Sequence, residues 1–185
     1  MQNIAIKTLK IFVILQLLVL NTSCLDYSRN MVDGKLEPPE PGFFENDKTI
    51  GGIDSNNDGV RDDIERWINR EFPGEENYNK RMAWKQRAKS IRDVHLKATT
   101  REEAIKYLYL WNDAGVCSTY VYGVLESEPL RNKWDFGDDL MAKSNDTKER
   151  LGRWMFADQS FAGQSHTMPP YSKMPLKCNF TIKNE

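Results

Sequence analysis

The sequence predicts an all-α protein, a small helical bundle of about four helices followed by an extended C-terminal tail. Three observations support this fold class. Apolar residues recur at helical intervals in several segments, a capping box marks one helix start, and prolines separate the segments from one another. The length of 185 residues predicts one domain, with space for a tail, once an N-terminal segment is set aside.

Two amphipathic helices are predicted in the first half of the chain. The first leaves an acidic segment and covers about 60–72, where Pro73 and Gly74 stop it. The second covers about 77–98, and its apolar side consists of Met82, Trp84, Ala88, Ile91 and His95. Its remaining positions are mostly basic, whereas the segment before it is mostly acidic. We therefore expect these two regions to face each other.

The third predicted helix belongs at the centre of the domain. Thr100 and Glu103 form a capping box that starts it, and the following segment is apolar almost all round. Gly115 would let a neighbour approach this helix closely. Pro129 ends the helix, and a linker with space for a short helical turn precedes a fourth helix over about 146–161. The tail contains three prolines and is expected to be extended.

Residues 1–23 are similar to an export signal. Two lysines precede the apolar run 11–20, which is too short to span a bilayer. The run ends in Leu-Asn-Thr-Ser-Cys, which resembles the lipobox of bacterial lipoproteins, although Asn21 stands where that family usually has leucine. The resemblance implies that Cys24 becomes the lipid-bearing N-terminus. The alternatives are ordinary signal cleavage and a structural role for Cys24.

A proline-rich tether is predicted for 24–49, between the lipid anchor and a helical domain that covers 50–185. The lipoprotein resemblance also implies a location, because the residue after the cysteine influences sorting. Here that residue is Leu25 rather than an aspartate, which implies the outer membrane of the bacterial cell envelope. A periplasmic or secreted protein is the alternative.

The chain contains three cysteines, an odd number for an exported protein. If Cys24 carries a lipid, Cys117 and Cys178 form a natural pair in an oxidising compartment. Their bridge would close a loop of about 60 residues and stabilise the fold by roughly 3–4 kcal/mol. The alternative is two buried free thiols.

The segment Asp54–Glu65, DSNNDGVRDDIE, alternates oxygen-bearing side chains around a glycine. Positions 1, 3, 5, 7, 9 and 12 of an EF-hand calcium loop are matched in order by Asp54, Asn56, Asp58, the Val60 carbonyl, Asp62 and Glu65. Gly59 stands at the position that needs a sharp turn. The pattern fits Ca²⁺, which takes several oxygen ligands, and four carboxylates this close would repel one another without a cation. The alternative is a solvated acidic turn that caps the next helix.

The surroundings of this loop differ from those of a paired EF-hand. A paired hand has an entering helix and an aliphatic residue at its eighth position, whereas here NDKTIGGI precedes the loop and Arg61 takes that position. The segment Asp54–Trp67 looks more like the single calcium loops of thrombospondin type 3 repeats and dockerin modules, and it resembles a segment of uncharacterised exported bacterial proteins. This resemblance implies calcium binding and no activity. Exported sites bind calcium with dissociation constants of about 10⁻⁴–10⁻³ M, which suits a structural ion.

Motifs for catalysis are not found. The chain has no H-E-x-x-H, no G-x-S-x-G and no glycine-rich phosphate loop. His95, His166 and the pair Glu126 and Glu128 are the remaining candidates for acid–base chemistry. The formal net charge of −1 gives no bias toward nucleic acid.

The sequence therefore predicts a non-enzymatic, calcium-binding exported lipoprotein with a binding or accessory role in the envelope. Its expected partners are calcium, a membrane through the lipid anchor, and an envelope protein or polymer. One alternative is a small envelope hydrolase that acts on a carbohydrate or peptide polymer. Another is a secreted eukaryotic module, suggested by the glycosylation patterns Asn145-Asp-Thr and Asn179-Phe-Thr.

Overall fold

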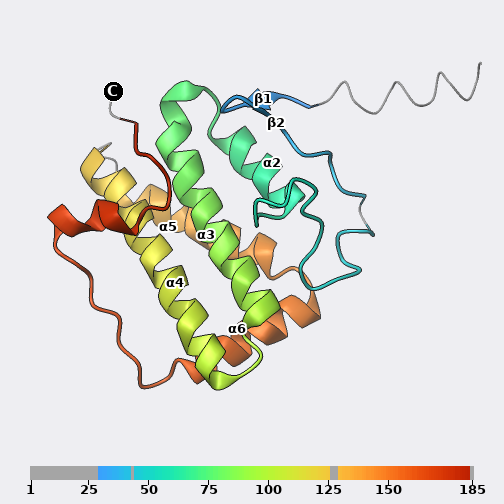
Figure 1. Cartoon of the computed structure of the whole chain (residues 1–185), viewed down its shortest axis with the longest axis vertical. Coiled ribbons are helices and arrows are strands. Elements are labelled where there is room, and N and C mark those ends of the chain that lie inside the picture. The colour runs from blue at the N-terminus through green and yellow to red at the C-terminus, as the bar shows by residue number, and fades with distance from the viewer. Residues whose placement is uncertain (1–28, 43, 126–128, 184–185) are drawn as a thin grey trace, which may run out of the picture. The chain divides into compact units, whose positions relative to one another are not determined.

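A computed structural model of the protein describes residues 29–42, 44–125 and 129–183 (Figure 1). The predicted export signal and Cys24 lie outside the described residues. The described residues belong to two compact units, divided between Pro39 and Glu40. In the part of the chain that is described, no helix combines the length and the apolar character needed to cross a membrane.

The described part of the first unit is a short hairpin. Strand β1 (Met31–Val32) pairs antiparallel with β2 (Lys35–Leu36). Between them Asp33 and Gly34 both have positive φ, which is the conformation that a two-residue Asp-Gly hairpin turn requires. This hairpin lies within the segment that the sequence predicts to be a tether.

The second unit is helical, so the all-α prediction is confirmed. Its described helices are α2 (Asp62–Glu71), α3 (Tyr78–Lys97), α4 (Arg101–Tyr120), α5 (Leu130–Ser144) and α6 (Lys148–Ser160). Three shorter helical segments are η1 (Glu75–Asn77), η2 (Val121–Leu125) and η3 (Tyr171–Lys177). Helix α2 begins inside the acidic loop, and η2 continues α4 as one wider turn.

Helices α3 and α4 lie side by side along most of their length and form the centre of the second unit (Figure 1). The capping box between them is confirmed: Glu103 N donates to Thr100 Oγ1, and Thr100 N donates to the Glu103 carboxylate. The apolar side of α3 is buried, with Trp84 and Ile91 inaccessible to solvent. Local sequence signals were sufficient here because they agree with the tertiary packing.

Helix α5 occupies the segment that the sequence predicts to be a linker with at most a short turn, so that prediction is wrong. Phe136 of α5 stacks on Trp67 with ring centroids 4.3 Å apart and lies 4.5 Å from Trp84. Leu140 is completely buried in the same core cluster. Packing of these side chains overrides the weak helix propensity of Gly137 and its aspartate neighbours.

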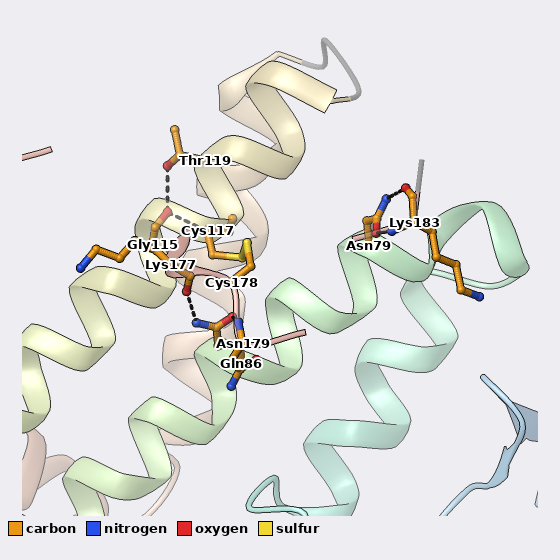
Figure 2. The surroundings of a disulfide bond; sticks show 10 residues. Asn79, Gln86, Gly115, Cys117, Thr119, Lys177, Cys178, Asn179 and Lys183 are labelled. Atoms are coloured by element: carbon orange, nitrogen blue, oxygen red, sulfur yellow. Dashed lines mark hydrogen bonds between the residues drawn. A yellow bond between two sulfur atoms is a disulfide. The ribbon is translucent and has the colours of Figure 1, made fainter. Parts of the chain in front are cut away.

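The C-terminal tail is tied to the helices by a disulfide and by side-chain amides (Figure 2). Cys117 of α4 is bonded to Cys178, as predicted. Gln86 of α3 donates to the Lys177 carbonyl at 2.7 Å, and Asn79 donates to the Lys183 carbonyl at 2.8 Å. The tail was predicted to be extended, but Tyr171–Lys177 form the 3₁₀ segment η3, and the other described residues of the tail belong to no helix or strand.

Candidate functional site

Carboxylates near the start of the acidic loop shape its backbone. The two Asp54 oxygens accept hydrogen bonds from Asp58 N at 3.2 Å and from Gly59 N at 3.1 Å. Asp58 Oδ1 accepts from Val60 N at 2.8 Å. Asn57 and Gly59 have positive φ, which turns the chain sharply twice. The loop therefore has a defined conformation in which its first and fifth positions are anchored to the backbone.

Asp62 closes the loop and starts α2. Its backbone N donates to the Ile53 carbonyl at 2.9 Å, and its Oδ1 accepts from Ser55 N at 3.0 Å. These two bonds join the first residues of the loop to its ninth position. The N-terminal end of α2 also favours the negative charge of this residue.

The second carboxylate oxygen of Asp62 has no hydrogen-bond partner among the described residues. Asp62 is 0% exposed, and its Oδ2 is buried without a hydrogen bond in the structure. Burial raises the pKa of Asp62, and the neighbouring charges of Asp54 and Asp58 raise it further, against hydrogen bonds from Ser55. A buried carboxylate oxygen without a partner destabilises the fold, so a cation at this point would relieve both burial and repulsion.

Basic side chains of α3 face the loop, as the charge pattern predicts. Lys85 Nζ lies 2.9 Å from Glu65 Oε1, and Arg92 Nη1 lies 3.1 Å from Asp54 Oδ2. Lys89 Nζ donates to the Asp58 carbonyl at 3.0 Å. These contacts neutralise the two ends of the loop and leave Asp62 between them without a cation.

Asn56 turns its amide nitrogen toward the last predicted ligand. Its Nδ2 donates to Glu65 Oε2 at 3.0 Å, while its Oδ1 accepts from Asp58 N at 3.1 Å. Glu65 is thus held by Lys85 on one oxygen and by Asn56 on the other. In this arrangement, and among the residues described, no three acidic, histidine or cysteine side chains form a group able to hold a metal ion.

A pair of buried arginines joins the loop to the corner between α5 and α6. Arg61 donates to Asp63 at 2.6 Å and to Asp146 at 2.8 Å. Arg150 is 0% exposed and donates to Asp146 and to the carbonyls of residues 46, 49 and 50. Burial alone would lower the pKa of Arg61, but the bonds to Asp63 and Asp146 outweigh it and raise that pKa. A paired EF-hand has an aliphatic residue at the eighth loop position. In this chain Arg61 takes that position and binds carboxylates at the start of α2 and between α5 and α6.

The histidine candidates for catalysis have structural partners. His95 is 1% exposed, and its Nε2 lies 2.9 Å from Asn145 Oδ1. Because the Asn145 amide nitrogen donates to the Met141 carbonyl, its oxygen must accept from His95. Burial lowers the pKa of His95 to about 4. The cavity beside His95 measures about 10 Å³, which leaves space for about one water molecule.

His166 belongs to a different group of residues. Its Nε2 lies 3.1 Å from Asp113 Oδ1, and Lys177 Nζ lies 2.8 Å from the other oxygen of the same carboxylate. Burial raises the pKa of Asp113, but the two hydrogen bonds outweigh it and hold that pKa below its usual value. The structure gives His95 and His166 no common partner, and Glu126 and Glu128 lie outside the described residues.

We compared the chain with models of protein families, with curated proteins and with solved structures, and none of the three comparisons gives a match. The predicted calcium ligands lie on one continuous segment, but in the described conformation their acidic side chains do not form a group able to hold a metal ion. The functional proposal therefore rests on the geometry and charge of that segment.

Proposed function

We propose that this protein is an exported calcium-binding lipoprotein with a non-enzymatic binding role in the bacterial envelope. One calcium ion would be held at 54–65 and stabilise the helical domain. A lipid on Cys24 would attach the protein to the outer membrane, and the helical domain would bind an envelope protein or polymer. The presence of the Cys117–Cys178 disulfide supports an oxidising location.

The observation that carries the calcium proposal is the buried, unpartnered oxygen of Asp62. It lies where the charges of Asp54 and Asp58 already act on it. A divalent cation supplies the missing positive charge and accepts carboxylate oxygens in flexible geometry. The residues that would hold the ion are Asp54, Asn56, Asp58, the Val60 carbonyl, Asp62 and Glu65.

Calcium would compete with groups that hold Glu65 in the described conformation. Both oxygens of this carboxylate have partners, the Lys85 ammonium and the Asn56 amide. For Glu65 to bind the ion, Lys85 must release it and the Asn56 side chain must present its oxygen. This competition lowers the affinity and is consistent with the millimolar range of exported calcium sites.

Calorimetric titration of the full-length protein in mild detergent, with melting curves in parallel, tests the proposal. One ion per chain should bind, and the fold should gain about 2.7 kcal/mol when free calcium is about 100 times the dissociation constant. Asp62→Asn should abolish this gain. Glu71→Gln removes an exposed carboxylate at the far end of the same helix and should leave it intact. Absence of calcium binding, or equal gains in both variants, would contradict the proposed site.

Fractionation of cells tests the proposed anchor separately. Cys24→Ser should move the protein from the membrane fraction to the soluble fraction, because the lipobox resemblance makes Cys24 the residue that carries the lipid. An unchanged distribution would rule out anchoring through Cys24 and leave the calcium proposal intact.

A further inference from the structure

A pocket of about 520 Å³ opens between four helices on a different part of the second unit. Helices α3, α4, α5 and α6 each contribute one indole to it, and these are Trp84, Trp111, Trp134 and Trp154. The volume lies in the usual range for small-molecule sites. Trp134 is 61% exposed, which is unusual for so large an apolar side chain.

Arg87 enters this pocket without an acidic partner. Its guanidinium lies 4.5 Å from the Trp111 ring, and its Nε is buried with no hydrogen bond. Burial lowers the pKa of Arg87 to about 10, although the Asp138 charge acts in the opposite direction. Within the described residues no carboxylate forms an ion pair with this arginine. The guanidinium therefore carries its charge beside the pocket without an ion-pair partner among the described residues, which is rare for a group so poorly solvated.

Gly115 of α4 leaves the space that the Arg87 guanidinium occupies. A β-carbon at this position of α4 would lie 2.5 Å from Arg87 Nη1, which is too close for any real contact. The close approach predicted for Gly115 thus occurs, and the approaching group is an arginine side chain. The missing side chain of Gly115 leaves space for the guanidinium beside α4, and a β-carbon there would push the end of the arginine side chain away.

Lys133 adds a second cation to the same pocket. Its ammonium donates to Thr119 Oγ1 and has no ion pair among the described residues. Burial and, to a smaller extent, the charge of Arg87 together lower the pKa of Lys133 to about 8. The two cations thus repel each other, and an anion between them would remove that repulsion. The buried Nε1 of Trp111 is a further donor without a partner.

Two carboxylates also line the pocket and limit what it can hold. Asp138 and Asp158 are both exposed, so they lie toward the solvent side while the cations are more deeply placed. With two acidic and two basic groups, the formal charges balance. A monoanion with hydrogen-bond donors fits this pattern better than a dianion such as phosphate, which the carboxylates would repel.

We propose that this pocket binds a small ring compound that bears one carboxylate. The ligand carboxylate binds Arg87 and Lys133, because a guanidinium offers paired donors that match its two oxygens. The ring packs against the indoles, which favour flat or C–H-rich surfaces. Hydroxyl or amine groups of the ligand donate to Asp138 and Asp158. The site is independent of the proposed calcium loop, and neither proposal requires the other.

Calorimetry of the full-length protein with matched probes tests the inference. The charged probes are benzoate and D-glucuronate, the neutral counterparts are benzamide and D-glucose, and inorganic phosphate is the dianion. At least one carboxylate should bind saturably below about 10 mM, with its neutral counterpart at least about tenfold weaker. Equal affinity for both members of a pair, preference for phosphate, or no binding of either carboxylate would overturn the proposal.

Three variants assign the binding to this pocket. Arg87→Met should weaken the carboxylate probe by at least about tenfold, the loss expected for a charge-assisted hydrogen bond. Gly115→Ala should weaken it as well, because the added methyl displaces the guanidinium while the arginine remains. Arg101→Met removes an exposed arginine at the start of α4 and should have no effect. Unchanged affinity in folded Arg87→Met would overturn the assignment, whatever the result for Gly115→Ala.

Discussion

The acidic loop and the tryptophan pocket are opposite in charge, yet each contains a buried polar atom without a partner. In the loop this atom is Asp62 Oδ2, and in the pocket it is Arg87 Nε. Arg61 and Arg150, which are also buried, differ from both because carboxylates and backbone carbonyls surround them. Buried charges with complete sets of partners hold this fold together. Asp62 and Arg87, each with one buried polar atom that has no hydrogen bond among the described residues, are where ligands of opposite charge are proposed.

Buried charges with and without partners should affect the free energy of unfolding in opposite directions. A buried polar group without a hydrogen bond costs about 1–3 kcal/mol, and a charged one costs more. A fold that is stable by about 5–15 kcal/mol can carry a few such groups, but removing them should then stabilise the empty protein. Removing a fully paired charge should do the opposite.

The largest effect should come from the paired arginine. Arg150→Met removes every bond to the carbonyls of residues 46, 49 and 50 and leaves Asp146 with Arg61 alone. Asp146 is 36% exposed and keeps Arg61, so the main cost is the loss of the hydrogen bonds to the carbonyls, at about 1–3 kcal/mol for each acceptor left unsatisfied. Chemical denaturation measures this loss, and Arg101→Met is the exposed control. A loss below about 1 kcal/mol would mean that the arginine cluster does not hold the loop.

His95 makes the stability of the fold depend on pH, because burial and the nearby charges of Arg150 and Arg61 lower its pKa. Its pKa in the fold is about 4, below the unfolded value, so the unfolded chain binds the proton more strongly between about pH 6.5 and 4. Stability should therefore fall as the pH decreases through this range, by up to about 3 kcal/mol from this group.

His95→Gln keeps a donor for Asn145 but cannot titrate. Unfolding free energies at about pH 7 and pH 4.5 should therefore show a smaller difference for this variant than for the wild type, even though carboxylates titrate in both proteins. Identical pH dependence would mean that His95 is not held neutral by burial.

The smallest expected effect concerns Lys85, the α3 lysine that forms an ion pair with Glu65 of the loop. Lys85→Met frees one oxygen of Glu65 and removes a competing positive charge, so calcium should bind about fivefold more tightly. Calcium titration measures the change, and Lys97→Met removes a lysine of the same helix that pairs with Asp93 instead. Weaker binding in Lys85→Met would contradict the proposed competition for Glu65.

Features that depend on local sequence were predictable, and features that depend on distant contacts were not. The capping box of Thr100 and Glu103 spans four residues, and the cysteine pair followed from the odd number of cysteines in a chain predicted to be exported. Helix α5 was missed because Phe136 and Leu140 are helical through packing on other helices. Because aspartates and a glycine surround these two residues, prediction from neighbouring residues alone gives a linker.

The same limit applies to the sites. The predicted calcium ligands lie within one segment of twelve residues, so their spacing could be recognised in the sequence, and calcium binding stays a prediction. By contrast, the ion pair of Arg61 with Asp146 joins residues 85 positions apart. The pocket takes one tryptophan from each of four helices, and Arg87 looked like one more basic residue on a solvated face. No spacing pattern distinguishes an arginine with a partner from one without.

The most direct test of the account is the unfolding free energy of Asp62→Asn and Arg87→Met in chelator and without any added ligand. Each variant removes a buried charge that has no complete set of partners, so both should be as stable as the wild type or more stable, by up to about 1–2 kcal/mol. Arg150→Met, measured in the same series, should be strongly destabilised. If Asp62→Asn and Arg87→Met lost as much stability as Arg150→Met, these charges would be structural, and their missing partners would not mark ligand sites.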